Sequence, residues 1–165
     1  MNYFFDSNII VYAYDPDAGV KRSRAHDLID RHARDATLTV STQVLQESYV
    51  NLVRRRHLKP DQALRVVGDL ADSRVVPADA ASVLRGLQLS QRHQLSPWDG
   101  SIVQAALDAG CTVLYTEDLQ AGQRFGDLEI VNPFDEAVHA PRAAWPAVAA
   151  KKAARKPAAK RTAKR

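Results

Sequence analysis

Cysteine and long apolar runs are almost missing from this sequence of 165 residues. Cys111 is the single cysteine, so no intrachain disulfide can form, and we interpret it as a small buried side chain rather than a nucleophile. No apolar run approaches the roughly 18 residues that a bilayer-spanning helix needs. The start, MNYFFDSNII, lacks the basic first segment of a secretory signal. These absences predict a cytoplasmic protein with no membrane partner.

Two common kinds of functional site are also missing from the sequence. No GxxxxGK[ST] loop occurs, which excludes the usual phosphate-cradling turn of nucleotide-binding proteins. The histidines show no metal-ligand spacing with one another, and we expect them at exposed helix positions. They are His26, His32, His57, His93 and His139.

The net charge of +4 hides two segments of opposite sign. Residues 151–165, KKAARKPAAKRTAKR, hold eight basic residues and no acid, which leaves 15 bases against 19 acids in the rest of the chain. We therefore predict a folded domain at 1–137, a linker at 138–150 and a disordered basic tail at 151–165. The tail either binds nucleic-acid phosphates without sequence preference or serves as a solubilising extension. Its basic residues are Lys151, Lys152, Arg155, Lys156, Lys160, Arg161, Lys164 and Arg165.

Short β-rich runs alternate with segments of helical periodicity along the first 135 residues. This alternation predicts a mainly parallel sheet covered by helices on both faces, an α/β fold. We expect strands at 3–5, 37–41, 74–76, 113–115 and 129–131, and helices at 8–14, 20–34, 42–56, 60–71, 79–93 and 96–110.

Four acids that lie far apart in the sequence should meet at one edge of this sheet. Asp6 and Asp118 follow expected strands, and Glu47 and Asp99 lie near the starts of expected helices. Ligands bind beyond the carboxyl ends of the strands in open parallel sheets, and all four positions belong to that edge.

Clustered carboxylates repel one another, so such a group implies a cation. Oxygen ligands favour Mg²⁺ or Mn²⁺, which can activate water and polarise a phosphodiester. Each acid also has a simpler interpretation. Asp6 is suited to cap a helix, Asp99 to form a capping box with Ser96, Asp118 to occupy a turn and Glu47 to face solvent. The cluster is favoured because Asp99 shares a helix stripe with apolar residues and Asp6 follows an apolar strand.

Four segments, taken in order, resemble the acidic motifs of PIN domains. They are FFDSNIIVYA, STQVLQESY, SPWDGSIVQAAL and VLYTEDLQAGQ, and IVNPF resembles the family's closing strand. The resemblance covers roughly residues 1–135 and is strongest to the VapC-type toxins of bacterial toxin–antitoxin pairs. It implies a three-layer α/β/α sandwich with four or five strands. It also implies a Mg²⁺- or Mn²⁺-dependent endoribonuclease, a homodimer that cleaves RNA and is inhibited by a cognate antitoxin.

The resemblance also assigns roles to individual residues. Asp6 and Asp99 are implied as direct metal ligands, while Glu47 and Asp118 serve a second ion or act through water. Asn8 and Thr116 match supporting polar positions in the family. Glu117 is a competing acid beside Asp118, but the motif favours Asp118, and only one of two neighbours in an extended stretch should enter the site.

Two other functions fit parts of the same pattern. A non-catalytic PIN-like module that binds RNA or a partner would share the fold, although the presence of all four acids argues against it. A phosphotransferase of the haloacid dehalogenase type also carries an aspartate after its first strand. It needs a second aspartate two residues later, where this chain has Asn8.

Overall fold

The structure is a computed structural model that describes residues 2–55 and 58–135. The predicted linker at 138–150 and basic tail at 151–165 lie outside the described residues, as do His57 and His139. The strands are β1 (Tyr3–Phe5), β2 (Leu38–Ser41), β3 (Arg74–Val76), β4 (Val113–Tyr115), β5 (Arg124–Phe125) and β6 (Leu128–Val131). The helices are α1 (Ser7–Tyr14), α2 (Val20–Arg34), α3 (Thr42–Arg55), α4 (Pro60–Ala71), α5 (Ala80–His93) and α6 (Pro97–Asp108).

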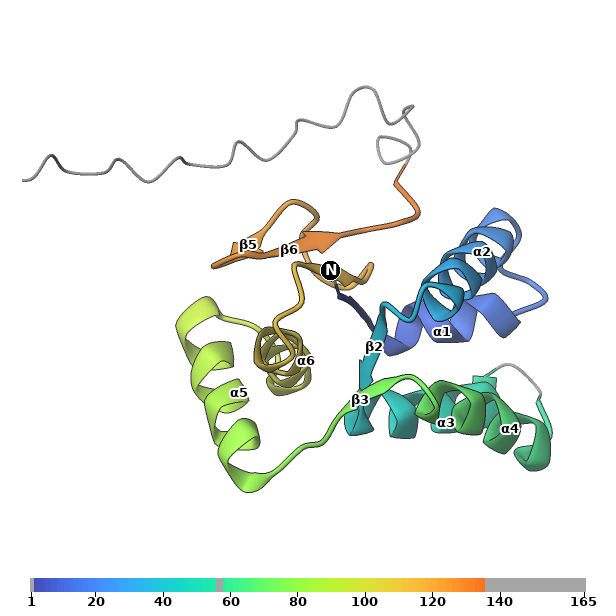
Figure 1. Cartoon of the computed structure of the whole chain (residues 1–165), viewed down its shortest axis with the longest axis horizontal. Helices are drawn as coiled ribbons and strands as arrows, with labels where there is room; N and C mark the ends of the chain where they lie inside the picture. The colour runs from blue at the N-terminus through green and yellow to red at the C-terminus, as the bar shows by residue number, and fades with distance from the viewer. Residues whose placement is uncertain (1, 56–57, 136–165) are drawn as a thin grey trace, which may run out of the picture.

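The strands form one sheet in the order β3-β2-β1-β4-β6-β5, in which only β5 runs antiparallel to its neighbour. Helices α1 to α4 lie on one side of this sheet and α5 and α6 on the other (Figure 1). The predicted α/β fold with three layers is therefore confirmed. None of the helices in residues 2–55 and 58–135 has the length and apolar character of a membrane span.

In the described residues the sheet has six strands rather than the expected four or five, and the additional one is β5, a two-residue edge strand. Phe125 pairs with Leu128 across a turn that contains Gly126 at a φ of 62°. A Gly-Asp pair between two strands is a hairpin signal, but two residues are too few to show an alternating pattern. The expected strand at 129–131 begins one residue earlier, at Leu128, because Leu128 pairs with Phe125 of the unpredicted β5.

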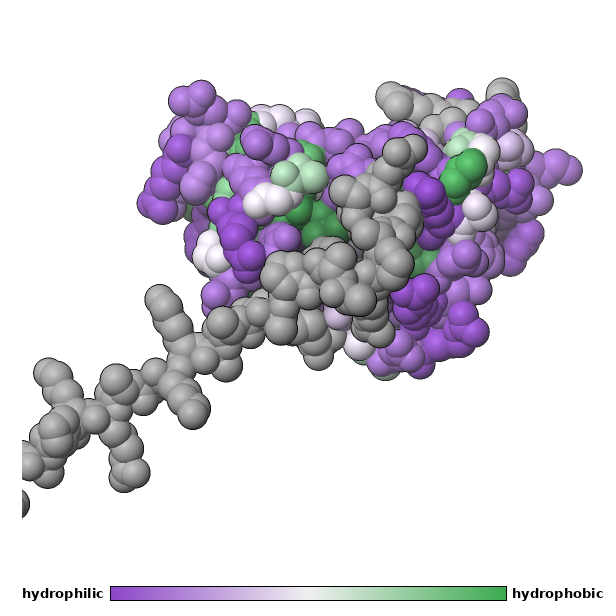
Figure 2. All heavy atoms as spheres, turned by 90° about the horizontal axis from the view of Figure 1, so that it is seen from above, coloured by the Kyte–Doolittle hydropathy of each residue, from purple (hydrophilic) through white to green (hydrophobic). Residues whose placement is uncertain are grey.

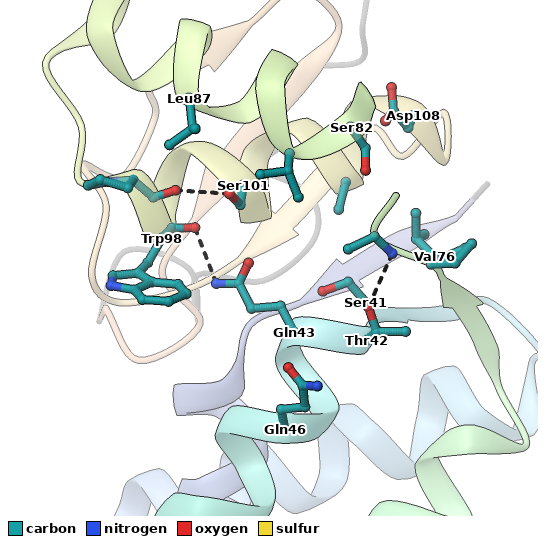
Figure 3. A pocket seen from close by; sticks show the side chains of 15 residues that line it. Ser41, Thr42, Gln43, Gln46, Val76, Ser82, Leu87, Trp98, Ser101 and Asp108 are labelled. Carbon is teal, nitrogen blue, oxygen red and sulfur yellow. Dashed lines mark hydrogen bonds between the residues drawn. The ribbon is translucent and has the colours of Figure 1, made fainter. Parts of the chain in front are cut away.

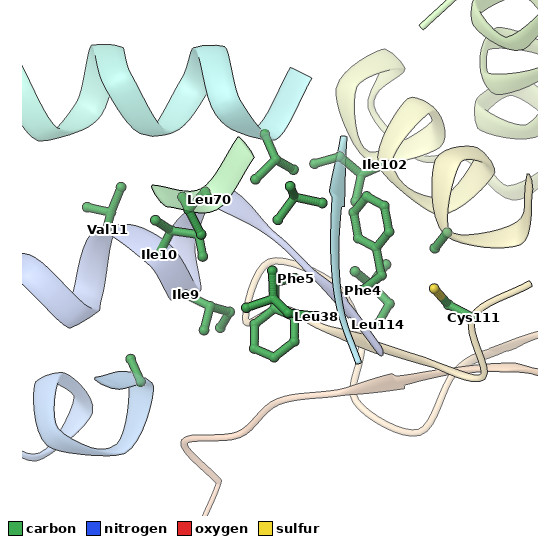
Figure 4. Close-up of a cluster of buried hydrophobic side chains, with 14 of the residues drawn as sticks. Phe4, Phe5, Ile9, Ile10, Val11, Leu38, Leu70, Ile102, Cys111 and Leu114 are labelled. Atoms are coloured by element: carbon green, nitrogen blue, oxygen red, sulfur yellow. The ribbon is translucent and has the colours of Figure 1, made fainter. Parts of the chain in front are cut away.

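The hydrophobic core lies on both faces of the sheet, and its centre is β1 (Figure 4). Phe4 and Phe5 are both fully buried. Because neighbouring side chains of a strand point to opposite faces, these two rings anchor opposite helical layers. Hydrophilic residues cover most of the face of the molecule that Figure 2 shows. Hydrophobic residues are visible mainly in a hollow near the middle of this face.

The position of β1 determines where a ligand can bind. The chain builds β2 and β3 on one side of β1, and then returns to place β4 on its other side. The connections after β1 and β4 therefore separate at this point, which is where open α/β sheets form their binding crevice. Phe5 pairs with Tyr115 at the carboxyl ends of these strands, so the residues that follow both strands meet.

His32 differs from the expectation that the histidines are exposed. It is buried against the rings of Tyr3, Phe5 and Tyr115, and its Nδ1 lies 2.8 Å from the hydroxyl of Thr37. Burial lowers the pKa of His32, which favours the neutral ring. This histidine belongs to the core rather than to a functional site.

Candidate functional site

Asp6 is a buried acid at the centre of the sheet edge. It directly follows β1, is only 4% exposed, and caps α1, which starts at Ser7 and not at the expected Asn8. Its Oδ1 accepts a hydrogen bond of 2.6 Å from the backbone N–H of Ser7. The capping role and the clustered position, which the sequence left as alternatives, occur together in this residue.

Two polar side chains, those of Thr116 and Asn8, connect Asp6 to the segment that follows β4. The buried hydroxyl of Thr116 donates to Oδ2 of Asp6 at 2.6 Å. The amide of Asn8 lies between the two strand ends, with Nδ2 at 3.2 Å from Asp6 Oδ2, 3.0 Å from Thr116 Oγ1 and 2.9 Å from Asp118 Oδ2. One side-chain amide therefore bridges two of the predicted acids, and Thr116 also accepts from the backbone N–H of Asp118.

Glu47 joins the same network from α3. The hydroxyl of Ser7 donates to Glu47 Oε2 at 2.8 Å, and Gln43, one helical turn earlier, donates to Oε1 at 2.9 Å. The sequence argument missed Ser7 and Gln43 as contributors. Two signals could have identified them. Ser7 follows Asp6 directly, and Gln43 stands four residues before Glu47, a spacing that places Gln43 and Glu47 on one face of the helix.

Asp99 is placed next to this network but is not joined to it by its own carboxylate. It is half-buried in the first turn of α6, and the hydroxyl of Ser96 donates to its Oδ2 at 2.7 Å while accepting from its backbone N–H. The connection runs through Trp98, whose carbonyl accepts a bond of 3.3 Å from Gln43. The expected apolar stripe is present, because Ile102, Val103 and Ala106 are buried.

Glu117 and Asp118 point to different partners. Lys21 of α2 forms an ion pair of 2.5 Å with Glu117, and the hydroxyl of Tyr12 also donates to that carboxylate. Asp118 instead contacts Asn8 and contributes to the electrostatics of Asp6. The structure thus separates the competing acid from the cluster and gives it a cation of its own.

The electrostatics of Asp6 reflect burial among like charges. The pKa of Asp6 is raised from 3.8 to about 6, mainly by burial and also by the charges of Asp118 and Glu47, and hydrogen bonds from Thr116 and Ser7 partly oppose the rise. Within residues 2–55 and 58–135, no lysine or arginine forms an ion pair with any of the four predicted acids. The cluster therefore holds excess negative charge that its own surroundings do not neutralise.

The chemistry of these donors fits a hard divalent cation. Carboxylate, hydroxyl and amide oxygens are the groups that Mg²⁺ and Mn²⁺ prefer. The carbonyl oxygen of Asn8 is buried and has no hydrogen-bond partner, so it is a further unsatisfied oxygen at this place. In the described part of the chain, however, no three histidine, cysteine, aspartate or glutamate side chains are already arranged to hold a metal ion.

Comparison with known proteins gives both a family and a fold. The family model of the PIN domain matches residues 3–124. The structure resembles Mycobacterium tuberculosis VapC20, a toxin that cleaves the sarcin–ricin loop, with a TM-score of 0.57 and 17% identity over 68% of this chain and 87% of that one.

Two further solved structures have the same fold. VapBC2 from Rickettsia felis, bound to a DNA fragment from its promoter, gives a TM-score of 0.56 at 20% identity over 79% of this chain and 97% of that one. DNA-bound VapBC from Salmonella typhimurium gives 0.57 at 19% identity over 79% and 96%. No curated protein matches the chain.

Proposed function

The chain belongs to the PIN domain family, and we propose that it is a Mg²⁺- or Mn²⁺-dependent endoribonuclease, the toxin of a bacterial toxin–antitoxin pair. The observation that carries this proposal is the buried Asp6, which shares Asn8 with Asp118 and is connected through Ser7 to Glu47. A chain that buries an acid among other acids without a basic partner loses stability unless a cation binds there. The toxin VapC20, which has the same fold, cleaves the sarcin–ricin loop.

The proposed ligands are the acids that the resemblance to PIN domains implies. Asp6 and Asp99 would hold the cation directly, and Glu47 and Asp118 would hold a second ion or act through water. Mg²⁺ or Mn²⁺ bound there would polarise the scissile phosphodiester, lower the pKa of a water molecule and stabilise the leaving oxygen.

Neighbouring residues of the chain would keep these acids in place. Thr116 and Asn8 hold the Asp6 carboxylate in a fixed orientation, and Asn8 does the same for Asp118. Ser7 and Gln43 fix Glu47 from both sides. Ser96 positions Asp99 at the start of α6. The geometry of the site is therefore set by neutral donors, which leave its negative charge available for a cation.

Cleavage of end-labelled RNA with Mg²⁺, with Mn²⁺ and with EDTA tests the activity. Wild-type protein should cleave with either cation and not with EDTA. Asp6→Asn and Asp99→Asn should each abolish cleavage with the fold intact, as judged by circular dichroism. Asp127→Asn, at an exposed turn between β5 and β6, is the matched control and should cleave normally.

Two results would contradict the proposed chemistry. Cleavage that persists in EDTA would exclude the metal dependence, and wild-type rates in both site variants would exclude the acid cluster. RNA binding without cleavage under either cation would instead favour the non-catalytic PIN-like module.

We further propose a cognate antitoxin as partner, a homodimer as the assembled form and the cytoplasm as the location. The two VapBC structures that share the fold are toxin–antitoxin complexes by their names. Expression in bacteria should arrest growth, and co-expression of the product of an adjacent short gene should relieve the arrest. Sedimentation of the purified chain measures its oligomeric state. Growth that is unaffected by the wild type and by Asp6→Asn alike would argue against a toxin.

A further inference from the structure

A pocket of about 430 Å³ opens at the start of α3, where Gln43 and Trp98 line it (Figure 3). It lies between the start of α3, the segment that follows β3, and helices α5 and α6. Pockets for small organic groups have volumes of roughly 300 to 1,000 Å³, so this one has room for a planar heterocycle. Its position at the ends of β2 and β3 places it on the same sheet edge as Asp6.

Two residues of the pocket connect it to the proposed catalytic centre. Gln43 lines the pocket, and its Nε2 donates both to Glu47 and to the carbonyl of Trp98. Trp98 lines the pocket too and directly precedes Asp99. A phosphodiester held at the acids would thus have an adjoining nucleotide within reach of this pocket.

The lining favours an uncharged flat group over a phosphate. The indole of Trp98 is 68% exposed, and Figure 3 shows it at the rim beside Gln43. Among the lining residues that the structure describes, Asp108 is the only ionisable one, and it is bound to Arg85 at 2.7 Å and to Gln104 at 2.8 Å.

Apolar and neutral polar groups complete the walls of the pocket. Val83 and Leu87 form an apolar wall, and Gln46 and Ser82 supply neutral polar groups. Single-stranded RNA is recognised in this way, with bases stacked on aromatic rings and their edges hydrogen-bonded.

We propose that this pocket is a nucleobase subsite, in which Trp98 stacks on a base next to the scissile phosphate. The inference rests on the proposed ribonuclease function and adds the part of the substrate that the acids do not contact. Binding through this subsite depends on the base, in contrast to the phosphate binding expected of the basic tail. The subsite therefore contributes selectivity among single-stranded RNA segments.

The test measures RNA binding by the full chain in EDTA, so that cleavage does not interfere. The probes are labelled single-stranded RNA 10-mers, one homopolymer for each base and one abasic 10-mer with the same phosphates. Fluorescence anisotropy detects their binding. At least one base-containing 10-mer should bind more tightly than the abasic one. One stacked base should make this difference in affinity about 5- to 150-fold, and Trp98→Ala should remove it. Trp98→Phe should retain most of it.

Leu64→Ala is the matched control, because Leu64 is 63% exposed on α4 and does not line the pocket. Its base-dependent affinity should equal that of the wild type. Equal affinity of the wild type for the abasic and all base-containing 10-mers would overturn the subsite, as would unchanged base-dependent binding in Trp98→Ala. A change from dimer to monomer in Trp98→Ala with base-dependent binding intact would assign the pocket to a second copy and also overturn it.

Cleavage of a long RNA with Mg²⁺ separates failure of the subsite from failure of the function. Cleavage by the wild type without base-dependent binding would overturn the subsite alone. Absence of both cleavage and RNA binding would overturn the proposed function, and the subsite with it.

Discussion

Replacing Asp6 with asparagine should stabilise the protein while it destroys the proposed activity. The native site keeps an ionised carboxylate buried beside Asp118 and Glu47, and that arrangement opposes folding when no cation is bound. Asparagine is an equally good helix cap, so the hydrogen bond from Ser7 to the side chain can remain. In the wild type the side-chain carbonyl oxygen of Asn8 has no hydrogen-bond partner. In the variant this oxygen can accept from the new side-chain N–H group if the Asn8 amide rotates by half a turn.

The magnitude follows from the pKa of Asp6. The difference of about 2.2 between the folded value of about 6 and the ordinary 3.8 corresponds to about 3 kcal/mol at pH above 6. Asn8 would give up its present contacts when it turns over, so we expect a net gain of about 1 to 3 kcal/mol for Asp6→Asn, and a rise in Tm on the order of 5 °C.

The pH dependence has a defined sign. The pKa of Asp6 is higher in the folded chain than in the unfolded one, so folding takes up a proton between pH 3.8 and about 6. The wild type therefore loses stability as pH rises through that window, and Asp6→Asn does not. The difference in the free energy of unfolding between the two proteins should have its full value at pH 7.5. It should decline between pH 6 and pH 4, and vanish below the ordinary pKa of 3.8.

Urea denaturation in EDTA across this pH range measures the effect, with Asp127→Asn as a control that should match the wild type. Saturating Mg²⁺ should then stabilise the wild type, by about 2.7 kcal/mol at 100 times the Kd, and leave Asp6→Asn unchanged. A variant that is less stable than the wild type at pH 7.5 in EDTA would refute the reasoning. A stability difference that does not depend on pH would refute it as well.

Further substitutions and one truncation test separate parts of the structure. Thr116→Val removes the hydrogen bond that lowers the pKa of Asp6, so the acidic limb of the pH–cleavage profile should move to higher pH, whereas Thr116→Ser should leave it in place. In Gly100→Ala the added Cβ would lie 2.5 Å from a backbone oxygen of α5, and urea denaturation should show a loss of about 1 to 3 kcal/mol. Gly68→Ala, in open space on α4, should instead gain about 0.5 to 1 kcal/mol. Deleting 151–165 should weaken RNA affinity at low salt and reduce its salt dependence, with turnover at saturating RNA unchanged.

Local patterns in the sequence were sufficient to predict most elements of the fold. Helix ends were clear where a capping residue or a proline marks them, as at Asp79 and Pro97. The strand order was not predictable, because pairing such as that of Phe5 with Tyr115 joins residues more than 100 positions apart. The two-residue β5 was missed because it is too short to show a pattern. His32 was missed for a different reason: it lies seven residues after Ala25 on the buried face of α2, but its polar side chain favoured an exposed position.

The candidate site was predictable to the level of the sheet edge. Asp6 and Asp118 could be placed there because each follows a strand, and the structure brings both to Asn8. The bridges made by Ser7 and Gln43 depend on side-chain rotamers, which a sequence pattern does not specify. Whether Asp99 contacts Ser96 or the other acids was also undetermined, because both arrangements are compatible with the first turn of a helix.

Lys21 makes the choice between two adjacent acids depend on a helix nearly 100 residues away in the sequence. A slip by one residue in the segment after β4 would bring Glu117 toward Asn8 and pull it away from Lys21 and Tyr12. The slip would break that ion pair, and the energetic cost opposes it. Contacts from α1 and α2 therefore fix the register of the loop that carries Asp118. Substitutions at Lys21 in α2 can therefore alter which carboxylate faces Asn8 without any change in the loop itself.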